Sequence, residues 1–293
     1  MALNPPGEGY TVYHRHLQMT LNAALDYGAQ SLAALPTARR DAELLLMRAT
    51  GKDRAFLLTH PGTELTPGQQ STYEQWLVRR ARHEPIQYIT GEQEFYGLAL
   101  HVTPGVLIPR PETEHLVEAL LEQIPHNAPL RIADIGTGSG AIAIALARHL
   151  PHASITALDI SQPALAIARE NAERHKVADR IRFLESDLLE AVAHEKLDAI
   201  VSNPPYVPDS EVLDPQVRDF EPRTALYAGP SGLDVYQRLI PQAWAALKPG
   251  GWLLMEIGHG QRNALNELLK EWSGVSFVND LQGIPRVAIA RKS

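Results

Sequence analysis

The chain has 293 residues, 44% of them hydrophobic and 21% charged, with no cysteine and a formal net charge of −7. This is the composition of an ordinary globular protein that is long enough for two domains and lacks the ~20-residue apolar stretch of a membrane span. The acidic balance argues against a broad nucleic-acid-binding surface, and the absence of cysteine excludes disulfides and leaves the cytoplasm as the default location.

The first part of the chain has the periodicity and the start signals of helices. A capping residue precedes an apolar-periodic run at Thr20, Asp53 and Thr66-Pro67. The basic run over residues 79–83 is interpreted as a solvated helix face. We therefore predict a helical N-terminal domain over residues 1–90, in which the first fifteen or so residues form an extension without a secretory signal.

The pattern changes after this helical region. Two short apolar runs on either side of Gly97 indicate a β-hairpin. A proline-rich turn over residues 108–111 follows, and a helix is expected from residue 112 to about residue 123. We predict a hairpin linker over residues 91–110 and a second domain over residues 111–293.

Strands and helices alternate along the second domain. Strands are predicted at 131–134, 154–159, 181–185, 197–202, 252–257, 275–278 and 287–290, and helices at 140–149, 162–175, 233–247 and 261–272. This alternation predicts an α/β fold whose mostly parallel sheet has helices on both faces and binds ligands at the carboxyl ends of its strands. A turn is expected at residues 248–251, and the irregular stretch 208–231 is a candidate lid or binding loop.

A glycine-rich segment joins the first of these strands to its helix. It comprises Asp134, Gly136, Thr137, Gly138, Ser139 and Gly140. Its glycines permit a tight turn and a close approach of a ligand to the main chain, and their spacing also fits a dinucleotide fingerprint. Asp134 would place negative charge where a diphosphate would lie, so the ammonium group of an amino-acid ligand suits the position better.

Two more acidic residues follow strands of the same sheet. Asp159 is placed to accept hydrogen bonds from both hydroxyls of a ribose, which would suit nicotinamide and S-adenosylmethionine sites alike. Asp187 is interpreted as an acid beside an adenine amino group, with Leu188 covering the ring and offering its backbone N–H. The alternative is that Asp187 only caps a turn. The twelve histidines show no metal-ligand spacing, so no metal site is predicted.

The segment Asn203-Pro204-Pro205-Tyr206 follows a buried strand. Because proline lacks an N–H and has a fixed φ, the backbone must leave the sheet in a stiff, extended turn. The Asn203 side chain, the free Pro204 carbonyl and the flat Tyr206 ring together suit a planar NH2 group. Taken alone, such a segment is equally compatible with a structural turn.

Together these motifs resemble those of the S-adenosylmethionine-dependent class I methyltransferases, which have a Rossmann-like sheet. The blocks over residues 87–91, 103–114, 221–226 and 232–234 make the chain similar to the bacterial protein-(glutamine-N5) methyltransferases that modify peptide chain release factors. The resemblance covers nearly all of the chain from about residue 85. It implies a Rossmann-like domain joined by a β-hairpin to a small helical domain that binds the release factor.

The resemblance also implies the substrate, the cofactor and their residues. The glutamine amide of a Gly-Gly-Gln loop would be methylated from S-adenosyl-L-methionine, without a metal, a nucleic acid or a membrane. Asn203, Pro204 and Tyr206 would be catalytic and, with Pro205, would hold the amide. The cofactor would contact Asp134, Gly136, Thr137, Gly138, Ser139, Gly140, Asp159, Asp187, Leu188 and Asn203.

Three other functions are compatible with part of this pattern. An adenine-N6 methyltransferase of DNA or RNA would use the same four residues, Asn203 to Tyr206, on an exocyclic amine, but the acidic balance and the small helical domain disfavour it. A nicotinamide-dependent oxidoreductase would leave this segment unexplained. A non-catalytic adapter that binds release factors would not need an intact cofactor cleft.

Overall fold

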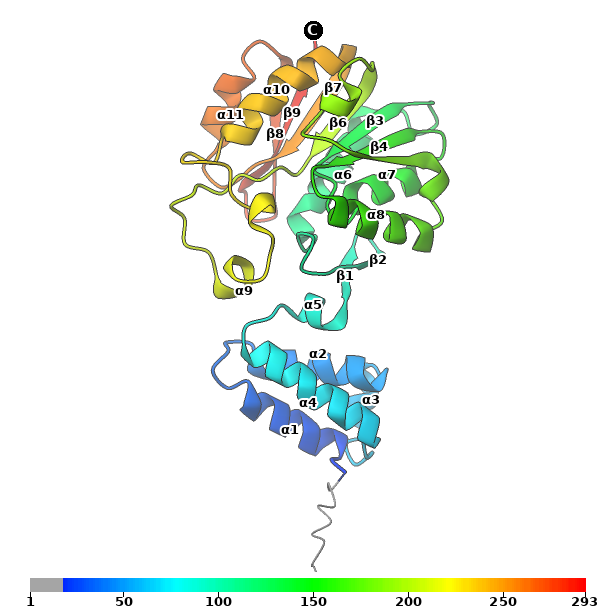
Figure 1. Ribbon diagram of the computed structural model, residues 1–293, viewed down its shortest axis with the longest axis vertical. Coiled ribbons are helices and arrows are strands. Elements are labelled where there is room, and N and C mark those ends of the chain that lie inside the picture. The colour runs from blue at the N-terminus through cyan, green and yellow to red at the C-terminus, as the bar shows by residue number, and fades with distance from the viewer. Residues whose placement is uncertain (1–17) are drawn as a thin grey trace, which may run out of the picture. The chain divides into compact units, whose positions relative to one another are not determined.

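The computed structural model describes residues 18–293, which divide into two compact units, one ending at Ile86 and the other spanning Gln87–Ser293. The predicted extension and the predicted lack of a secretory signal concern residues outside the described range. The predicted domain limits at residues 90 and 110 stay predictions. Each unit is described separately below (Figure 1).

The first unit is helical, as expected. Its helices are α1 (Leu21–Ser31), α2 (Ala38–Thr50), α3 (Arg54–Thr59) and α4 (Pro67–Ala81). The side chains of Thr20 and Asp53 cap α1 and α3, and Thr66 forms a capping box with Gln69 at the start of α4. The three predicted start signals are therefore confirmed.

A buried ion pair joins α2 to α4. Arg80 Nε donates to Asp41 Oδ2 at 2.7 Å, and both residues are buried. The prediction of a solvated face over residues 79–83 is wrong for Arg80, because the helix turns this side chain toward α2 while its neighbours face outward. Sequence spacing showed a run of charges but could not show that one of them had an acidic partner on another helix.

The predicted hairpin is confirmed at the start of the second unit. After the short helix α5 (Ile86–Thr90), β1 (Glu92–Phe95) pairs antiparallel with β2 (Leu98–His101). Tyr96 and Gly97 both have positive φ, as a tight two-residue turn of type I′ requires. The helix expected from residue 112 begins as a 3₁₀ turn, η1 (Pro111–Thr113), before α6 (Glu114–Gln123).

A seven-stranded sheet with the order β5-β4-β3-β6-β7-β9-β8 forms the centre of the second unit. Its strands are β3 (Arg131–Ile135), β4 (Ser154–Asp159), β5 (Ile181–Glu185), β6 (Leu197–Ser202), β7 (Leu247–Glu256), β8 (Ser273–Asn279) and β9 (Pro285–Arg291). Pairings from β5 through β7 are parallel, whereas β9 runs antiparallel to both of its neighbours. The prediction of a mostly parallel sheet is confirmed.

Helices cover both faces of this sheet, as Figure 1 shows. Besides α6, they include α7 (Ala141–His149), α8 (Gln162–Arg174), α10 (Asp234–Ala246) and α11 (Arg262–Leu268). Alternate residues of β3 enter different cores: Ile132 packs with α6 and α7, whereas Ala133 packs with α10 and α11. This alternation is what a strand buried on both faces requires.

Short helical elements complete the second unit. Two of the predicted boundaries also differ from those in the structure. They are η2 (Ala178–Arg180), η3 (Glu190–Val192), α9 (Pro215–Arg218) and η4 (Arg223–Ala225). The turn expected at residues 248–251 is wrong in detail, because β7 already begins at Leu247 and contains an irregularity before it pairs again at Trp252. Gly250, with φ of +77°, permits that bulge. Helix α11 ends at Leu268, earlier than expected.

Replacement of Gly28 by alanine is expected to destabilise the first unit. An ideal Cβ on Gly28 would lie 1.9 Å from Tyr73 Oη, so the buried Tyr73 must move and lose its hydrogen bond to the Ala42 carbonyl. The free energy of unfolding, measured by urea denaturation, should fall by about 1–3 kcal/mol.

Gly68→Ala provides the matched control, because no atom lies within 4 Å of its ideal Cβ. Removing a helical glycine in open space is expected to be neutral or to stabilise by up to ~1 kcal/mol. If Gly28→Ala stabilised the protein to the same extent, the packing between α1 and Tyr73 would not be the constraint described.

Candidate active site

The sequence-predicted site residues lie along one edge of the sheet, at or after the carboxyl ends of β3, β4, β5 and β6. The chain passes from β3 toward β5 on one side and from β6 toward β8 on the other, so the strand order reverses between β3 and β6. Ile135 pairs with Ser202 across these strands, and the Ser202 hydroxyl donates to the Ile135 carbonyl at 2.8 Å. The glycine-rich loop and Asn203 therefore emerge side by side.

Asp134 organises the glycine-rich loop from within. Its carboxylate is fully buried, and Oδ2 accepts from the Thr137 hydroxyl at 2.7 Å and from the Ala143 N–H at 3.1 Å. Because Ala143 lies in the first turn of α7, the carboxylate occupies the position that an anion takes at a helix N-terminus. Burial raises the pKa of Asp134 to about 7, and Oδ1 has no hydrogen-bond partner among the described residues.

The N–H groups of the loop also face protein acceptors. Gly136 and Thr137 donate to the Leu158 carbonyl at 2.8 and 2.9 Å, and Gly138 donates to Asp159 Oδ2 at 2.8 Å. A diphosphate cradle needs such groups free and pointing at the ligand. With a carboxylate at the helix terminus and these donors occupied, the loop is unsuited to a dinucleotide diphosphate.

Two glycines in this loop have distinct steric roles. Gly138 has a φ of +54° and nothing within 4 Å of its ideal Cβ, so the space beside it is open. Gly140 has a φ of +83°, and its Cβ would lie 3.1 Å from the Cβ of Ala168, where α7 approaches α8. The side chains of Thr137 and Ser139 are buried rather than exposed to this space.

Asp159 closes β4 and faces the same loop. Its two oxygens accept from the N–H groups of Gly138 and Ser161, at 2.8 and 2.9 Å. Each carboxylate oxygen retains a lone pair for a further donor. Burial raises the pKa of Asp159. The predicted ribose contact stays a prediction.

Asp187 and Leu188 form a half-buried corner after β5. Asp187 Oδ2 pairs with Arg238 of α10 at 2.5 Å, a partner that the sequence did not indicate. In the turn that follows, the Ser186 hydroxyl accepts from the Ala191 N–H and the Asp187 carbonyl accepts from the Glu190 N–H. Leu188 has a φ of +51°, and its N–H makes no hydrogen bond within residues 18–293. Such strain is typical of ligand-binding positions.

Asn203 is held by one end of its amide. Its Nδ2 donates to Thr113 Oγ1 at 3.0 Å, whereas its Oδ1 accepts no hydrogen bond within residues 18–293. The Pro204 carbonyl is likewise without a donor there. These are two free acceptors in the turn that the prolines impose.

Tyr206 is fixed by contacts at both ends. Its backbone N–H donates to the Leu226 carbonyl, and its hydroxyl lies 3.2 Å from Glu256 Oε1. Burial raises the pKa of Tyr206, and the neighbouring Glu256 adds to the effect. Sequence analysis missed Glu256. The signal available was an acidic residue directly after the apolar run 252–255, at the same edge of the sheet.

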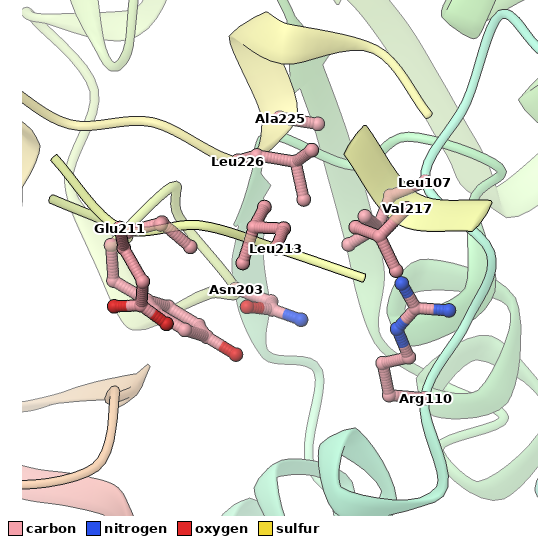
Figure 2. A pocket seen from close by; sticks show the side chains of 10 residues that line it. Leu107, Arg110, Asn203, Glu211, Leu213, Val217, Ala225 and Leu226 are labelled. Atoms are coloured by element: carbon pink, nitrogen blue, oxygen red, sulfur yellow. The ribbon is translucent and has the colours of Figure 1, made fainter. Parts of the chain in front are cut away.

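A cavity of about 240 Å³ opens beside Asn203 (Figure 2). Its polar lining comes from Asn203, Tyr206, Arg110 and Glu211. The remainder is apolar and is formed by Leu107, Val207, Leu213, Val217, Ala225 and Leu226. Figure 2 shows the Asn203 amide between the side chains of Glu211 and Arg110. We refer to this cavity as the acceptor pocket.

A buried carboxylate holds the wall of the acceptor pocket. Glu221 Oε1 pairs with Arg110 at 2.5 Å, and its Oε2 accepts from the Ile108 N–H at 3.2 Å. This ion pair joins the proline-rich turn to the irregular stretch 208–231. Arg110 therefore has a structural role in holding that stretch. Thr113 donates a hydrogen bond to Glu256. The negative charge of Glu112 raises the pKa of Glu256.

Two kinds of feature are not found within residues 18–293. No group of three or more histidine, aspartate or glutamate side chains there could hold a metal ion. None of the helices in this part of the chain has the length and the apolar character needed to span a bilayer.

Comparison with known proteins identifies two domains. Residues 23–91 match the PrmC N-terminal domain, and residues 105–220 match the methyltransferase small domain. The release factor glutamine methyltransferase of Koribacter versatilis is 48% identical over 279 residues, covering 94% of this chain and 99% of that protein. The enzyme of the same name from Geobacter sulfurreducens is 43% identical over 281 residues, covering 93% and 96%.

Solved structures share the fold over part of the chain at low sequence identity. A methyltransferase from Pyrococcus furiosus has a TM-score of 0.51 and 20% identity, and covers 68% of this chain and 90% of its own. The T. thermophilus 16S rRNA N2 G1207 methyltransferase, solved with AdoMet and guanosine, has a TM-score of 0.52 and 22% identity, with 69% and 50% covered. Together they show the class I methyltransferase fold.

Arg110→Ala is expected to loosen the stretch 208–231. The substitution leaves Glu221, whose side chain is 1% exposed, as a buried carboxylate without its cationic partner and with only the Ile108 N–H as a donor. Amide hydrogen exchange should accelerate in residues 208–231 by roughly tenfold or more, while exchange in the first unit stays unchanged.

Arg218→Ala is the matched control for this experiment. Arg218 forms a solvent-exposed pair with the adjacent Asp219, and exposed pairs contribute little. Equal exchange rates in the two variants would contradict a structural role for the Arg110–Glu221 pair.

Proposed function

The chain belongs to the release factor glutamine methyltransferase family, and from this we propose that it methylates the side-chain amide nitrogen of the glutamine in the Gly-Gly-Gln loop of peptide chain release factors. The observation that carries the proposal is the arrangement of Asn203. Its amide nitrogen is held by the hydrogen bond from Nδ2 to Thr113, and its Oδ1 accepts no hydrogen bond within residues 18–293 and belongs to a residue that lines the acceptor pocket. The carbonyl of the next residue, Pro204, is a second acceptor without a donor in that range.

The loop residues fit an S-adenosylmethionine molecule as methyl donor. Such a ligand would supply a partner for two groups, Asp134 Oδ1 and the Leu188 N–H, and would fill the open space at Gly138. We assign Asp159 to the ribose hydroxyls and Asp187 to the adenine side. When bound, the cofactor supplies an electrophilic methyl group on a positively charged sulfur.

The residues of the acceptor pocket position the amide that receives the methyl group. An amide nitrogen is a weak nucleophile because its lone pair is delocalised into the carbonyl, so catalysis depends on alignment. Correct positioning of two reactants can remove roughly 7–11 kcal/mol of a barrier. Asn203 Oδ1 and the Pro204 carbonyl each accept one N–H of the target amide, which fixes the nitrogen and directs it toward the methyl donor.

The same two acceptors favour the transition state over the ground state. Positive charge develops on the amide nitrogen as the new bond forms, and preorganised acceptors stabilise that charge without reorganising. Tyr206 and Pro205 border the planar amide. No strong base is required, because an N-alkylated amide that carries positive charge is very acidic and loses its proton to water.

The shape of the acceptor pocket is consistent with a glutamine in a glycine-rich loop. The pocket combines apolar side chains with polar ones from Asn203, Tyr206, Arg110 and Glu211. A side chain with methylenes and a terminal amide matches that distribution of apolar and polar lining. Flanking glycines, which lack side chains, would let the backbone approach the entrance closely. The first unit, in this proposal, binds the body of the release factor.

The other functions are less well supported. An adenine-N6 methyltransferase would also use Asn203, but the 48% identity over 94% of the chain is to a release factor glutamine methyltransferase. A nicotinamide enzyme is disfavoured because Asp134 and the occupied N–H donors leave no diphosphate cradle. An adapter without catalysis would not require the free acceptors at Asn203.

Incubation of the protein with a release factor and labelled S-adenosylmethionine is expected to add one methyl group to the glutamine of the Gly-Gly-Gln loop. The product is identified by peptide mass spectrometry. A release factor with asparagine in place of that glutamine is the control and should remain unlabelled. Label appearing only on DNA or RNA supplied in parallel would contradict the proposal.

Asn203→Ala is expected to lower kcat on the order of 10²–10³-fold, because one preorganised acceptor is lost. The affinity for S-adenosylmethionine, measured by calorimetry, should stay close to that of the wild type. Asp159→Ala should show the reverse order of effects, with weaker cofactor binding first. If Asn203→Ala retained nearly full turnover, the role assigned to Asn203 would be wrong.

A further inference from the structure

Glu256 is a fully buried carboxylate for which neither the cofactor nor the acceptor pocket provides a use. It closes β7 and is 2% exposed. Its Oε2 lies 2.5 Å from Thr113 Oγ1, and its Oε1 lies 3.2 Å from the Tyr206 hydroxyl. Both neighbours are hydroxyl groups, and one of them also contacts Asn203. A buried charge of this kind is costly unless its hydrogen bonds are specific.

The two hydrogen bonds that connect Asn203 to Glu256 run in one direction, from Asn203 to Thr113 and from Thr113 to Glu256. A carboxylate only accepts hydrogen bonds, so the Thr113 hydroxyl must direct its proton to Glu256. Thr113 Oγ1 is then left with lone pairs alone toward Asn203, and it accepts from Nδ2 at 3.0 Å. With its nitrogen so engaged, the Asn203 amide presents Oδ1 at the acceptor pocket.

We propose that Glu256 is a positioning residue that acts through Thr113 to hold the Asn203 amide with its oxygen toward the acceptor pocket. This inference deepens the proposed function and rests on it. Glu256 does not touch the substrate or the cofactor in this scheme. Its negative charge sets the direction of the Thr113 hydroxyl, and the hydroxyl in turn sets the orientation of the amide.

The opposite orientation would be unproductive. If the Thr113 hydroxyl donated toward Asn203, it would favour a flipped amide with Oδ1 facing Thr113 and Nδ2 facing the acceptor pocket. The target glutamine amide would then meet a donor where its own N–H needs an acceptor. In metal sites, removal of a group that orients a ligating residue typically costs 10–100-fold in affinity or activity, and a loss of similar order is expected for a group that orients Asn203.

The surroundings of Glu256 make this direction sensitive to pH. Burial, with a smaller contribution from nearby Glu112, raises the pKa of Glu256 to about 7 even though Arg286 and the hydrogen bonds from Thr113 and Tyr206 oppose the increase. The Tyr236 hydroxyl faces the backbone carbonyl of Glu256 rather than its side chain. A protonated Glu256 can donate to Thr113. The Thr113 hydroxyl can then donate to Asn203, which favours the unproductive orientation of the amide. The productive form is the charged one, so kcat should fall as pH falls through about 7.

Two substitutions at Thr113 test the inference. Thr113→Val keeps the shape of the side chain and removes the hydroxyl, and kcat should fall by at least about tenfold with the KM for S-adenosylmethionine unchanged. Thr113→Ser retains the hydroxyl and should recover most of the wild-type kcat. Thermal unfolding and cofactor calorimetry establish that both variants are folded. Equal kcat values for the valine and serine variants would overturn the inference.

Glu256→Gln provides a second and independent measurement. Glutamine has a similar shape and does not titrate, so the change in kcat near pH 7 that depends on Glu256 should be absent from this variant. Asp134 also titrates near pH 7, because burial raises its pKa to about 7, and it is intact in this variant. If the pH profile of kcat were identical to that of the wild type, the change near pH 7 would be due to Asp134, and the inference would be overturned.

The outcome for the wild type separates this inference from the proposed function. If the wild type methylates the release factor but the Thr113 and Glu256 variants behave as it does, only the inference is wrong. If the wild type binds S-adenosylmethionine but leaves the release factor unmethylated, the proposed function is wrong.

Discussion

The pairing of β3 with β6 is the constraint on which the rest of the site depends. These strands are distant in sequence but adjacent in the sheet, and Ile135 lies opposite Ser202. Their parallel register brings the glycine-rich loop and the Asn203 turn out at the same edge. Because the chain turns away in opposite directions from this point, no connecting helix covers the opening, and two reactants can be placed there.

Two buried carboxylates flank this opening and have similar physical roles. Asp134 lies one residue before the end of β3 and organises the donors of the glycine-rich loop, whereas Glu256 ends β7 and organises hydroxyls beside the acceptor pocket. Each is desolvated, and each has a pKa raised to about 7 by burial. The free-energy cost of burying them is offset by hydrogen bonds that fix the turns in one arrangement. Rigid placement of donors and acceptors is what a reaction governed by alignment needs.

The wall of the acceptor pocket depends on a third buried carboxylate. Glu221 joins the turn around Arg110 to a stretch that otherwise has little regular structure. This arrangement allows residues 208–231 to contribute apolar side chains without belonging to the sheet. The acceptor side of the site can therefore vary in shape while the cofactor side stays fixed by the sheet, which is how one fold accommodates different methyl acceptors.

Much of the secondary structure could be predicted from the sequence, because it depends on residues that are close together along the chain. Helix start signals at Thr20, Asp53 and Thr66, the hairpin at Gly97 and the alternation of strands and helices all follow from neighbouring residues. The candidate site residues were also identifiable, because parallel strands place their carboxyl ends at one edge. Their individual contacts with ligands stay predictions.

Only the tertiary structure decided which side chains are partners. Asn203 and Glu256 are connected through Thr113, which lies 90 residues from the one and 143 from the other. Asp187 pairs with Arg238, and the buried Arg80 pairs with Asp41. Periodicity shows which face of an element is buried, but a hydrogen bond between distant segments depends on where the completed fold places each polar group. The sequence determined the elements and the edge of the sheet where the site lies, and the packing of those elements determined how the Asn203 amide is held.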